Sequence, residues 1–208
     1  MLVNSDFDLP NSNAVSSAKG SFTDEVLWSS FKAGNELALS MLYKKHVQCL
    51  YNYGMHTCRD HDLVMDCLQD LFFTLWNKRV SLANVQVVKP YLFTSFRRIL
   101  IHQIVEMRKK SSSTADHAIA FEFMPSIESI LIEDEIKTEQ SSRLKNCIQS
   151  LTKGQREVIY LKFYNELTYH EIAEITELQV DSVYNLVSKT IEILRKKLQI
   201  AKPHIPLP

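Results

Sequence analysis

Glycine, proline and cysteine are all scarce in this sequence, and each scarcity excludes a class of structure. Its 208 residues include 4 glycines and 6 prolines, too few for the repeated tight turns of an all-β domain. The four cysteines, Cys49, Cys58, Cys67 and Cys147, form no C-x-x-C pair, which argues against a disulfide framework, a zinc site or a dithiol redox site.

Long apolar runs and a secretory leader are missing as well. No stretch approaches the roughly 18 uncharged apolar residues that a membrane span requires. The opening residues, MLVNSDFDLPNSN, have neither a basic segment nor an apolar segment of the kind found in signal peptides. We therefore expect no stable membrane insertion and a cytoplasmic location.

The net charge is zero, but the charges are unevenly distributed along the chain. Residues 25–110 and 143–208 carry net charges of +5 and +3, whereas residues 111–142 carry seven acidic side chains against Lys137 alone. Basic blocks suggest contact with a polyanion, and an acidic connector is unsuited to wrapping nucleic acid. Ordinary solvated surface charge would explain the same distribution.

Apolar residues recur at helical spacing along most of the chain, which predicts an all-α protein. The expected helices span residues 24–33, 36–57, 62–78, 90–110, 126–150, 169–175 and 180–198. Thr152-Lys-Gly-Gln155 and Thr168-Tyr-His-Glu171 each match the S/T-x-x-E/Q capping box at a helix start. We expect two small helical domains, at 24–110 and 140–200, joined by an acidic linker at 111–139 and flanked by a disordered tail over 1–23 and a C-terminal tail over 201–208.

The C-terminal block has the spacing of a helix-turn-helix. Ala173 lies where a small side chain lets the second helix cross closely, and Ile172, Ile175 and Val183 would fill the angle between the helices. The second helix would present hydroxyl, amide and ammonium groups to a DNA major groove, at Ser182, Tyr184, Asn185, Ser188 and Lys189. An antiparallel helical hairpin with a solvated outer face is the alternative. Upstream, Phe163 and Tyr164 are expected to pack in the C-terminal core.

The helix over 62–78 places an aromatic ring among polar side chains. Opposite its apolar stripe lie Asp66, Gln69, Asp70 and Phe73. An exposed phenylalanine surrounded by polar groups is typical of a protein interface, although single exposed apolar residues are also ordinary.

The helix over 90–110 is expected to bury an apolar face that includes Met107. Its other face carries hydroxyl, aromatic and cationic side chains, at Tyr91, Thr94, Arg97, Arg98, His102 and Lys109. Such groups can hold a phosphate backbone and stack on unpaired bases. A solvated basic helix would have a similar composition.

Read as blocks, these segments resemble a known family. LTKGQREVIYLKFYNELTYHEIAEITELQVDSVYNLVSKTIEILRKKL resembles the fourth conserved region of sigma-70-type transcription initiation factors, and also the DNA-binding domain of LuxR-type regulators. DCLQDLFFTLWNKR, followed by KPYLFTSFRRILIHQIVEMRKK, resembles the second conserved sigma region. With no third region between the blocks, the layout is similar to the extracytoplasmic-function (ECF) group.

The resemblance implies an alternative sigma factor that binds core RNA polymerase and promoter DNA. It implies that Asp66, Gln69, Asp70 and Phe73 dock on the β′ clamp helices, with the β flap as a further contact. The −10 element would be bound by Tyr91, Thr94, Arg97, Arg98, His102 and Lys109, with a flipped base captured by the loop over 81–87. The recognition helix would bind the −35 element. An anti-sigma factor is expected as a partner, and no catalytic residue, metal or cofactor is expected.

Two rival functions remain open at this stage. An HD-type metal phosphohydrolase could be built around His61-Asp62 with His46, His56 and Asp66, but Asp at a helix start is also an ordinary cap, and His46 is expected on the surface beside a core Cys49. A stand-alone helix-turn-helix regulator of LuxR type would bind duplex DNA tightly without polymerase.

Overall fold

The computed structural model describes residues 22–110, 121–122 and 144–198, and its elements within these ranges are all helices. They are α1 (Asp24–Lys32), α2 (Glu36–Cys58), α3 (His61–Lys78), α4 (Val88–Lys110), α6 (Lys153–Ile159), the π-helix η2 (Tyr160–Tyr164), α7 (Tyr169–Thr176) and α8 (Val180–Leu198). The predicted all-α fold is confirmed. None of the described helices is long and apolar enough to cross a membrane.

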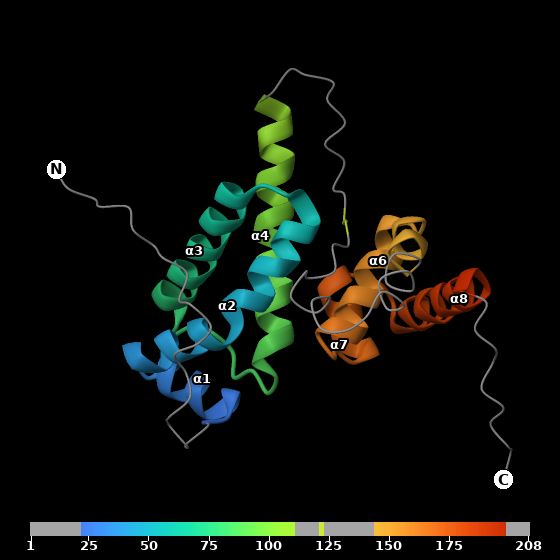
Figure 1. Ribbon diagram of the computed structural model, residues 1–208. Helices are drawn as coiled ribbons and strands as arrows, with labels where there is room; N and C mark the ends of the chain where they lie inside the picture. The colour runs from blue at the N-terminus through green and yellow to red at the C-terminus, as the bar shows by residue number, and fades with distance from the viewer. Residues whose placement is uncertain (1–21, 111–120, 123–143, 199–208) are drawn as a thin grey trace, which may run out of the picture.

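The N-terminal helices, α1 to α4, pack around one apolar core, whose fully buried side chains include Phe31, Leu50, Val64 and Phe96. Figure 1 shows α2 crossing α4, with α3 beside them. Gly54 of α2 makes this crossing possible, because a Cβ there would lie 2.8 Å from Val64 Cγ1 and 3.1 Å from Phe96 Cζ. A glycine inside a helix is otherwise unfavourable, so its place here is explained by the close approach of three helices.

Helix ends follow the expected capping chemistry. Both predicted capping boxes form, since Thr152 and Thr168 accept from the backbone N–H three residues on while the Gln155 and Glu171 side chains accept from the cap N–H. α2 and α7 end in left-handed residues, Arg59 at φ 54° and Glu177 at φ 60°.

The loop over residues 79–87 is tethered to α1. Trp28 Nε1 donates to the Ala83 carbonyl at 3.2 Å, and Lys32 Nζ donates to Asn84 Oδ1 at 2.7 Å. After this loop α4 begins at Val88, two residues before the predicted start at Pro90. Val88 is completely buried, and the first turn of a helix tolerates a proline because its N–H would be unpaired there in any case.

The C-terminal helices, α6 to α8, enclose a second set of buried side chains. Ile172, Ile175 and Val183 are each at most 1% exposed, as the helix-turn-helix prediction requires. The prediction that Phe163 and Tyr164 pack in this core is wrong, because they are 55% and 56% exposed. Their segment is wound as a π-helix, whose wider turn buries Tyr160 and Leu161 and leaves the residues that follow facing solvent.

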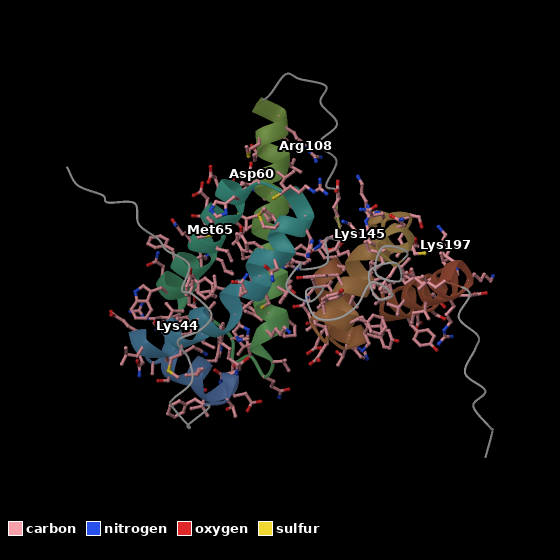
Figure 2. All side chains as sticks on the ribbon, viewed as in Figure 1. Lys44, Asp60, Met65, Arg108, Lys145 and Lys197 are labelled. Carbon is pink, nitrogen blue, oxygen red and sulfur yellow. The ribbon has the colours of Figure 1, made fainter. Side chains whose placement is uncertain are left out.

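The two sets of helices contact each other, with α7 packed on α4. The far end of α4, where Arg108 is labelled in Figure 2, extends beyond the other helices. Met107 is therefore 50% exposed rather than buried as predicted. Of the helix predicted over 126–150, residues 144–149 are helical. Residues 126–143 of that helix, almost all of the linker, residues 1–21 of the N-terminal tail and the C-terminal tail lie outside the described residues.

Candidate nucleic-acid interface

The helix α8 separates a buried face from an exposed face. Val183, Val187 and Thr190 are at most 1% exposed, and the Thr190 hydroxyl donates to the Leu186 carbonyl at 2.6 Å, so its polar group is satisfied within the core. The exposed face carries all five residues assigned to DNA by sequence, Ser182, Tyr184, Asn185, Ser188 and Lys189. Their hydroxyl, amide and ammonium groups can reach base edges and phosphates in a major groove.

A shallow groove beside α8 is lined by Tyr169, Tyr184 and Arg195, together with Glu192 and smaller or apolar side chains. The Tyr184 ring meets the edge of Tyr169 at 5.4 Å, and Lys162 Nζ lies 4.8 Å from the centre of the Tyr169 ring. Arg195 extends this lining toward the last turn, where it is followed by Lys196 and Lys197, the latter labelled in Figure 2. Three consecutive cations at this end of the helix suit contact with phosphates.

The helix α3 presents the predicted protein-docking residues on one exposed face. Asp66, Gln69, Asp70 and Phe73 are all exposed, and the Phe73 ring is 68% exposed. The opposite face is held in the core by buried side chains, among them Cys67. An aromatic ring this exposed, on a face that also carries two carboxylates, is available to anchor a partner.

The residues predicted to read the −10 element occupy two environments on α4. Tyr91 is half-buried against Trp28, with ring centres 5.2 Å apart, and the Thr94 hydroxyl donates to the Pro90 carbonyl at 2.9 Å. His102 and Lys109 are exposed, and Lys109 Nζ pairs with Glu106 at 2.8 Å. These exposed residues lie toward the end of α4 that extends beyond the other helices.

Arg97 and Arg98 are bound by carboxylates of the C-terminal helices. Arg97 Nε donates to Glu157 Oε1 at 2.9 Å, and the Tyr53 hydroxyl donates to the same oxygen at 2.6 Å. Arg98 Nε donates to Glu177 Oε1 at 3.0 Å in an exposed pair. Guanidinium groups bind carboxylates and phosphates in similar ways, and here a carboxylate holds the Nε of each of these two guanidinium groups.

The Arg97 cluster is largely removed from water. The side chains of Arg97 and Glu157 are 18% and 15% exposed. Burial is the largest single effect on the pKa of Arg97 and lowers it, but Glu157 and Tyr53 together outweigh burial and raise the pKa, which keeps the guanidinium charged. Burial, with a further contribution from Glu157, raises the pKa of the Tyr53 hydroxyl well above its ordinary value, which keeps it a donor.

Sequence reasoning missed the residues that join the two sets of helices. Lys89 Nζ of α4 donates to the Asn165 carbonyl at 2.7 Å. Phe121 is 2% exposed, with its ring 5.7 Å from Tyr53 of α2 and 5.5 Å from Tyr160 of η2. The available signal for this contact was the pair of aromatic residues, Phe121 and Phe123, in the acidic connector.

The histidines considered for a metal site have separate partners. His46 is buried and bonded to Asp24 at 3.0 Å, so its predicted surface position is wrong: Asp24, at the start of α1, supplies a polar partner inside the core. His61 Nδ1 bonds to the Tyr51 hydroxyl at 2.9 Å, and His56 Nδ1 to the Glu122 carbonyl at 2.8 Å. In the described parts of the chain, no three His, Cys, Asp or Glu residues are grouped so that they could hold a metal ion.

Comparison with known proteins gives matches to both sets of helices. Residues 141–194 match the family described as Sigma-70, region 4. Over 155 residues the chain is 25% identical to the ECF RNA polymerase sigma factor SigK of Mycolicibacterium vanbaalenii, a match that covers 72% of this chain and 76% of that protein.

Solved structures with a similar fold include two determined as complexes. CnrH, in complex with the cytosolic domain of CnrY, is 18% identical with a TM-score of 0.56, covering 86% of this chain and 99% of its own. The sigma factor RpoE, in complex with the anti-sigma factor NepR from Bartonella quintana, is 19% identical with a TM-score of 0.56, covering 78% and 98%. These likenesses support the fold.

The family match covers the C-terminal helices, and the match to SigK is longer. Residues 141–194 include α6, η2, α7 and most of α8, the helices that form the exposed recognition face. The match to SigK is too long to come from these helices alone, so it extends into the preceding part of the chain. Residues 141–194 therefore match the sigma-70 region 4 family, and over 155 residues the chain is similar to an ECF RNA polymerase sigma factor.

Proposed function

We propose that this chain is an alternative sigma factor that binds core RNA polymerase in the cytoplasm and directs it to a set of promoters, with no covalent chemistry of its own. The observation that carries the proposal is the helix-turn-helix of α7 and α8. Its five outward side chains lie on the helix that the sigma-70 region 4 match covers.

In this proposal α8 enters the major groove at the −35 element. Asn185 and Lys189 lie one turn apart on the exposed face, where an amide can pair with adenine and an ammonium with guanine or a phosphate. The cations of the last turn add affinity that depends on salt rather than on sequence. We propose that residues 140–200 form the domain that binds the −35 element and that residues 24–110 form the domain that binds polymerase and the −10 element. The linker over 111–139 joins them.

The N-terminal helices have two roles in this proposal. The exposed face of α3 docks on the β′ clamp helices of polymerase, with Phe73 as the anchor and the acidic side chains as the polar rim. The helix α4 holds the non-template strand of the −10 element through Tyr91, Thr94, Arg97, Arg98, His102 and Lys109. Aromatic stacking and phosphate contacts are the interactions that single strands favour.

Two further partners belong to the proposal. RpoE has been solved with an anti-sigma factor and CnrH with the cytosolic domain of CnrY, and this chain shares their fold. We therefore expect an anti-sigma partner here as well. The β flap of polymerase is the expected partner of the C-terminal helices.

Polymerase docking is tested with the double variant Phe73→Ala, Asp70→Ala. Loss of an interface anchor typically weakens binding by about 2 kcal/mol, or roughly 30-fold, so pull-down of core polymerase should fall strongly while circular dichroism is unchanged. Thr74→Ala, at an exposed position of the same helix, is the control and should leave pull-down intact. Equal pull-down by all three proteins would reject the docking face.

Promoter recognition is tested in the reconstituted holoenzyme with Asn185→Ala and Lys189→Ala. Each should reduce transcription from promoters that depend on the −35 element, by about tenfold for a lost base contact, while polymerase binding persists. Lys44→Ala, an exposed cation on α2, controls for the charge change. Tight duplex binding without any affinity for polymerase would instead favour a stand-alone regulator of LuxR type.

A further inference from the structure

An aromatic pair, Tyr169 and Tyr184, lies where the start of α7 meets the first half of α8. The two helices pack on each other (Figure 1), and the ring centres of the pair are 5.4 Å apart, with an angle of 66° between the ring planes. Tyr169 is half-buried, whereas Tyr184 is 57% exposed. One ring is therefore anchored in the protein, and the other rests against it at the surface.

Lys162 of η2 holds the Tyr169 ring in place. Its Nζ lies 4.8 Å from the centre of that ring and donates to the Leu167 carbonyl at 3.0 Å. A cation over an aromatic face is attracted to it, and the hydrogen bond to the backbone limits where the ammonium group can move. The edge-to-face contact passes this restraint on to Tyr184. The exposed ring therefore has less conformational entropy to lose when a ligand binds.

The two rings line the groove beside α8 together with apolar side chains. The groove has a volume of about 340 Å³ and includes Val187 and Ile191 in its lining, of which the first is 1% exposed and the second half-buried. Its charged residues, Glu192 and Arg195, are of opposite sign, so the groove has no net charge to attract a phosphate. An apolar group that enters beside Tyr184 would instead leave water for aromatic and aliphatic surroundings.

The place of Tyr184 along α8 suits a base edge better than a phosphate. In a helix-turn-helix the first turns of the recognition helix meet the base edges, and Tyr184 is the fifth residue of α8, whereas the consecutive cations lie in the last turn. Thymine is the base of unmodified DNA that presents a methyl group in the major groove, and apolar side chains read it by direct contact. A restrained ring beside apolar side chains offers a methyl group such a contact.

We propose that Tyr184 reads the C5-methyl group of a thymine in the −35 element, with Tyr169 and Lys162 as positioning residues that hold its ring. This inference rests on the proposed function, because it assumes that α8 enters the major groove there. The polar side chains of α8 can read hydrogen-bonding groups, which thymine shares with uracil. The Tyr184 ring adds a preference for the methyl group itself, which those contacts cannot supply.

The test replaces the thymines of a −35 duplex one at a time with deoxyuridine, which lacks the C5-methyl group and keeps the base-pairing groups. The duplex comes from a promoter that the wild-type holoenzyme transcribes, and its affinity for the holoenzyme is measured by competition. At one position the deoxyuridine duplex should bind about fourfold more weakly, the effect of leaving one methyl group in water. The ratio of the two affinities at that position is the readout for every variant.

The variants show whether the aromatic pair is responsible for this ratio. Tyr184→Ala removes the ring and should abolish the preference for thymine, whereas Tyr184→Phe keeps the ring and should preserve it. Tyr169→Ala and Lys162→Met should each weaken the preference because the Tyr184 ring loses its support, and Tyr169→Phe should retain it. Phe163→Ala, at an exposed ring outside the groove, is the matched control and should leave the ratio unchanged. Circular dichroism checks that all of them keep the helical content of the wild type.

Each outcome decides the inference separately from the proposed function. A wild-type holoenzyme that binds every deoxyuridine duplex as tightly as the thymine duplex would overturn it, even if transcription is normal. A ratio that persists in Tyr184→Ala would overturn it as well, and one that persists in Tyr169→Ala would overturn the positioning role. If the chain does not bind polymerase, the proposed function fails, and the same substitutions in a duplex selected by the free chain decide the inference. A chain that selects no duplex in either form overturns both.

Discussion

Gly54 is the residue on which the tightest packing among the N-terminal helices depends. It lies where α2 meets Val64 of α3 and Phe96 of α4, and both neighbours are fully buried. Neither can retreat, because a packed core has no free volume into which a methyl group could push them. The sequence alone shows a glycine in a helical segment, but the identity of the residues it meets depends on the way three separate helices cross.

Gly54→Ala is expected to destabilise the protein despite the higher helix propensity of alanine. Overpacking a core typically lowers stability by about 1–3 kcal/mol, and the propensity gain of about 1 kcal/mol offsets only part of that. Urea unfolding followed by circular dichroism measures the difference. Gly154→Ala is the matched control, because the nearest atom to a Cβ there, Leu186 Cδ2, is 3.9 Å away; a similar loss at both glycines would contradict the packing argument.

At the scale of the element, the local sequence specifies where helices begin more securely than how they are wound. The two capping boxes are predicted from side chains three positions apart, and both form because their hydrogen bonds need nothing beyond that segment. The π-helix of η2 has no comparable local signal. The positions of Phe163 and Tyr164 were therefore predicted incorrectly, since a change of winding alters which residues face the core.

The Thr168 cap supports both the stability of α7 and the placement of α8 behind it. Thr168→Ala removes the acceptor for the Glu171 N–H, 3.3 Å away, and should lower the free energy of unfolding by about 1 kcal/mol. Thr168→Ser keeps the hydroxyl and should stay close to the wild type. Thermal unfolding of the three proteins, with duplex binding measured in parallel, checks the expectation; an alanine variant that unfolds like the serine variant would show that the cap contributes nothing.

At the scale of the whole molecule, sequence patterns predict each set of helices but not the contact between them. Phe73 and the outward residues of α8 lie on the exposed faces that helical periodicity indicates, because periodicity reports which side of a single helix is apolar. Glu157 and Arg97 are 60 residues apart in sequence, and neither interrupts an amphipathic pattern. Their pairing depends on the tertiary packing of α7 on α4, which no local pattern encodes.

Acid should destabilise the contact around His56. Its ring lies 4.7 Å from Tyr160 and 5.8 Å from Phe121, and burial, together with Arg59, lowers its pKa from 6.5 to about 4. The unfolded chain therefore takes up this proton at a higher pH than the folded chain. The contribution of His56 is complete above about pH 6.5 and is lost as the pH falls toward 4, by on the order of 3 kcal/mol.

The measurement is the free energy of unfolding across this pH range for the wild type and for His56→Gln. The glutamine variant should lose part of the slope. It should keep some slope because burial also lowers the pKa of His46, which acts with the same sign. Identical slopes for the two proteins would exclude His56 as a source of the acid sensitivity.

The hydrogen bonds that tie α1 to the loop over 79–87 affect the entropic cost at which this loop would bind a promoter strand. Trp28 and Lys32 fix this loop at two points, so its conformational entropy is lost when the protein folds rather than when a base arrives. A loop ordered in advance binds its ligand with a smaller entropic penalty. If the loop does capture a flipped base, α1 is then a determinant of duplex opening although none of its residues needs to touch DNA.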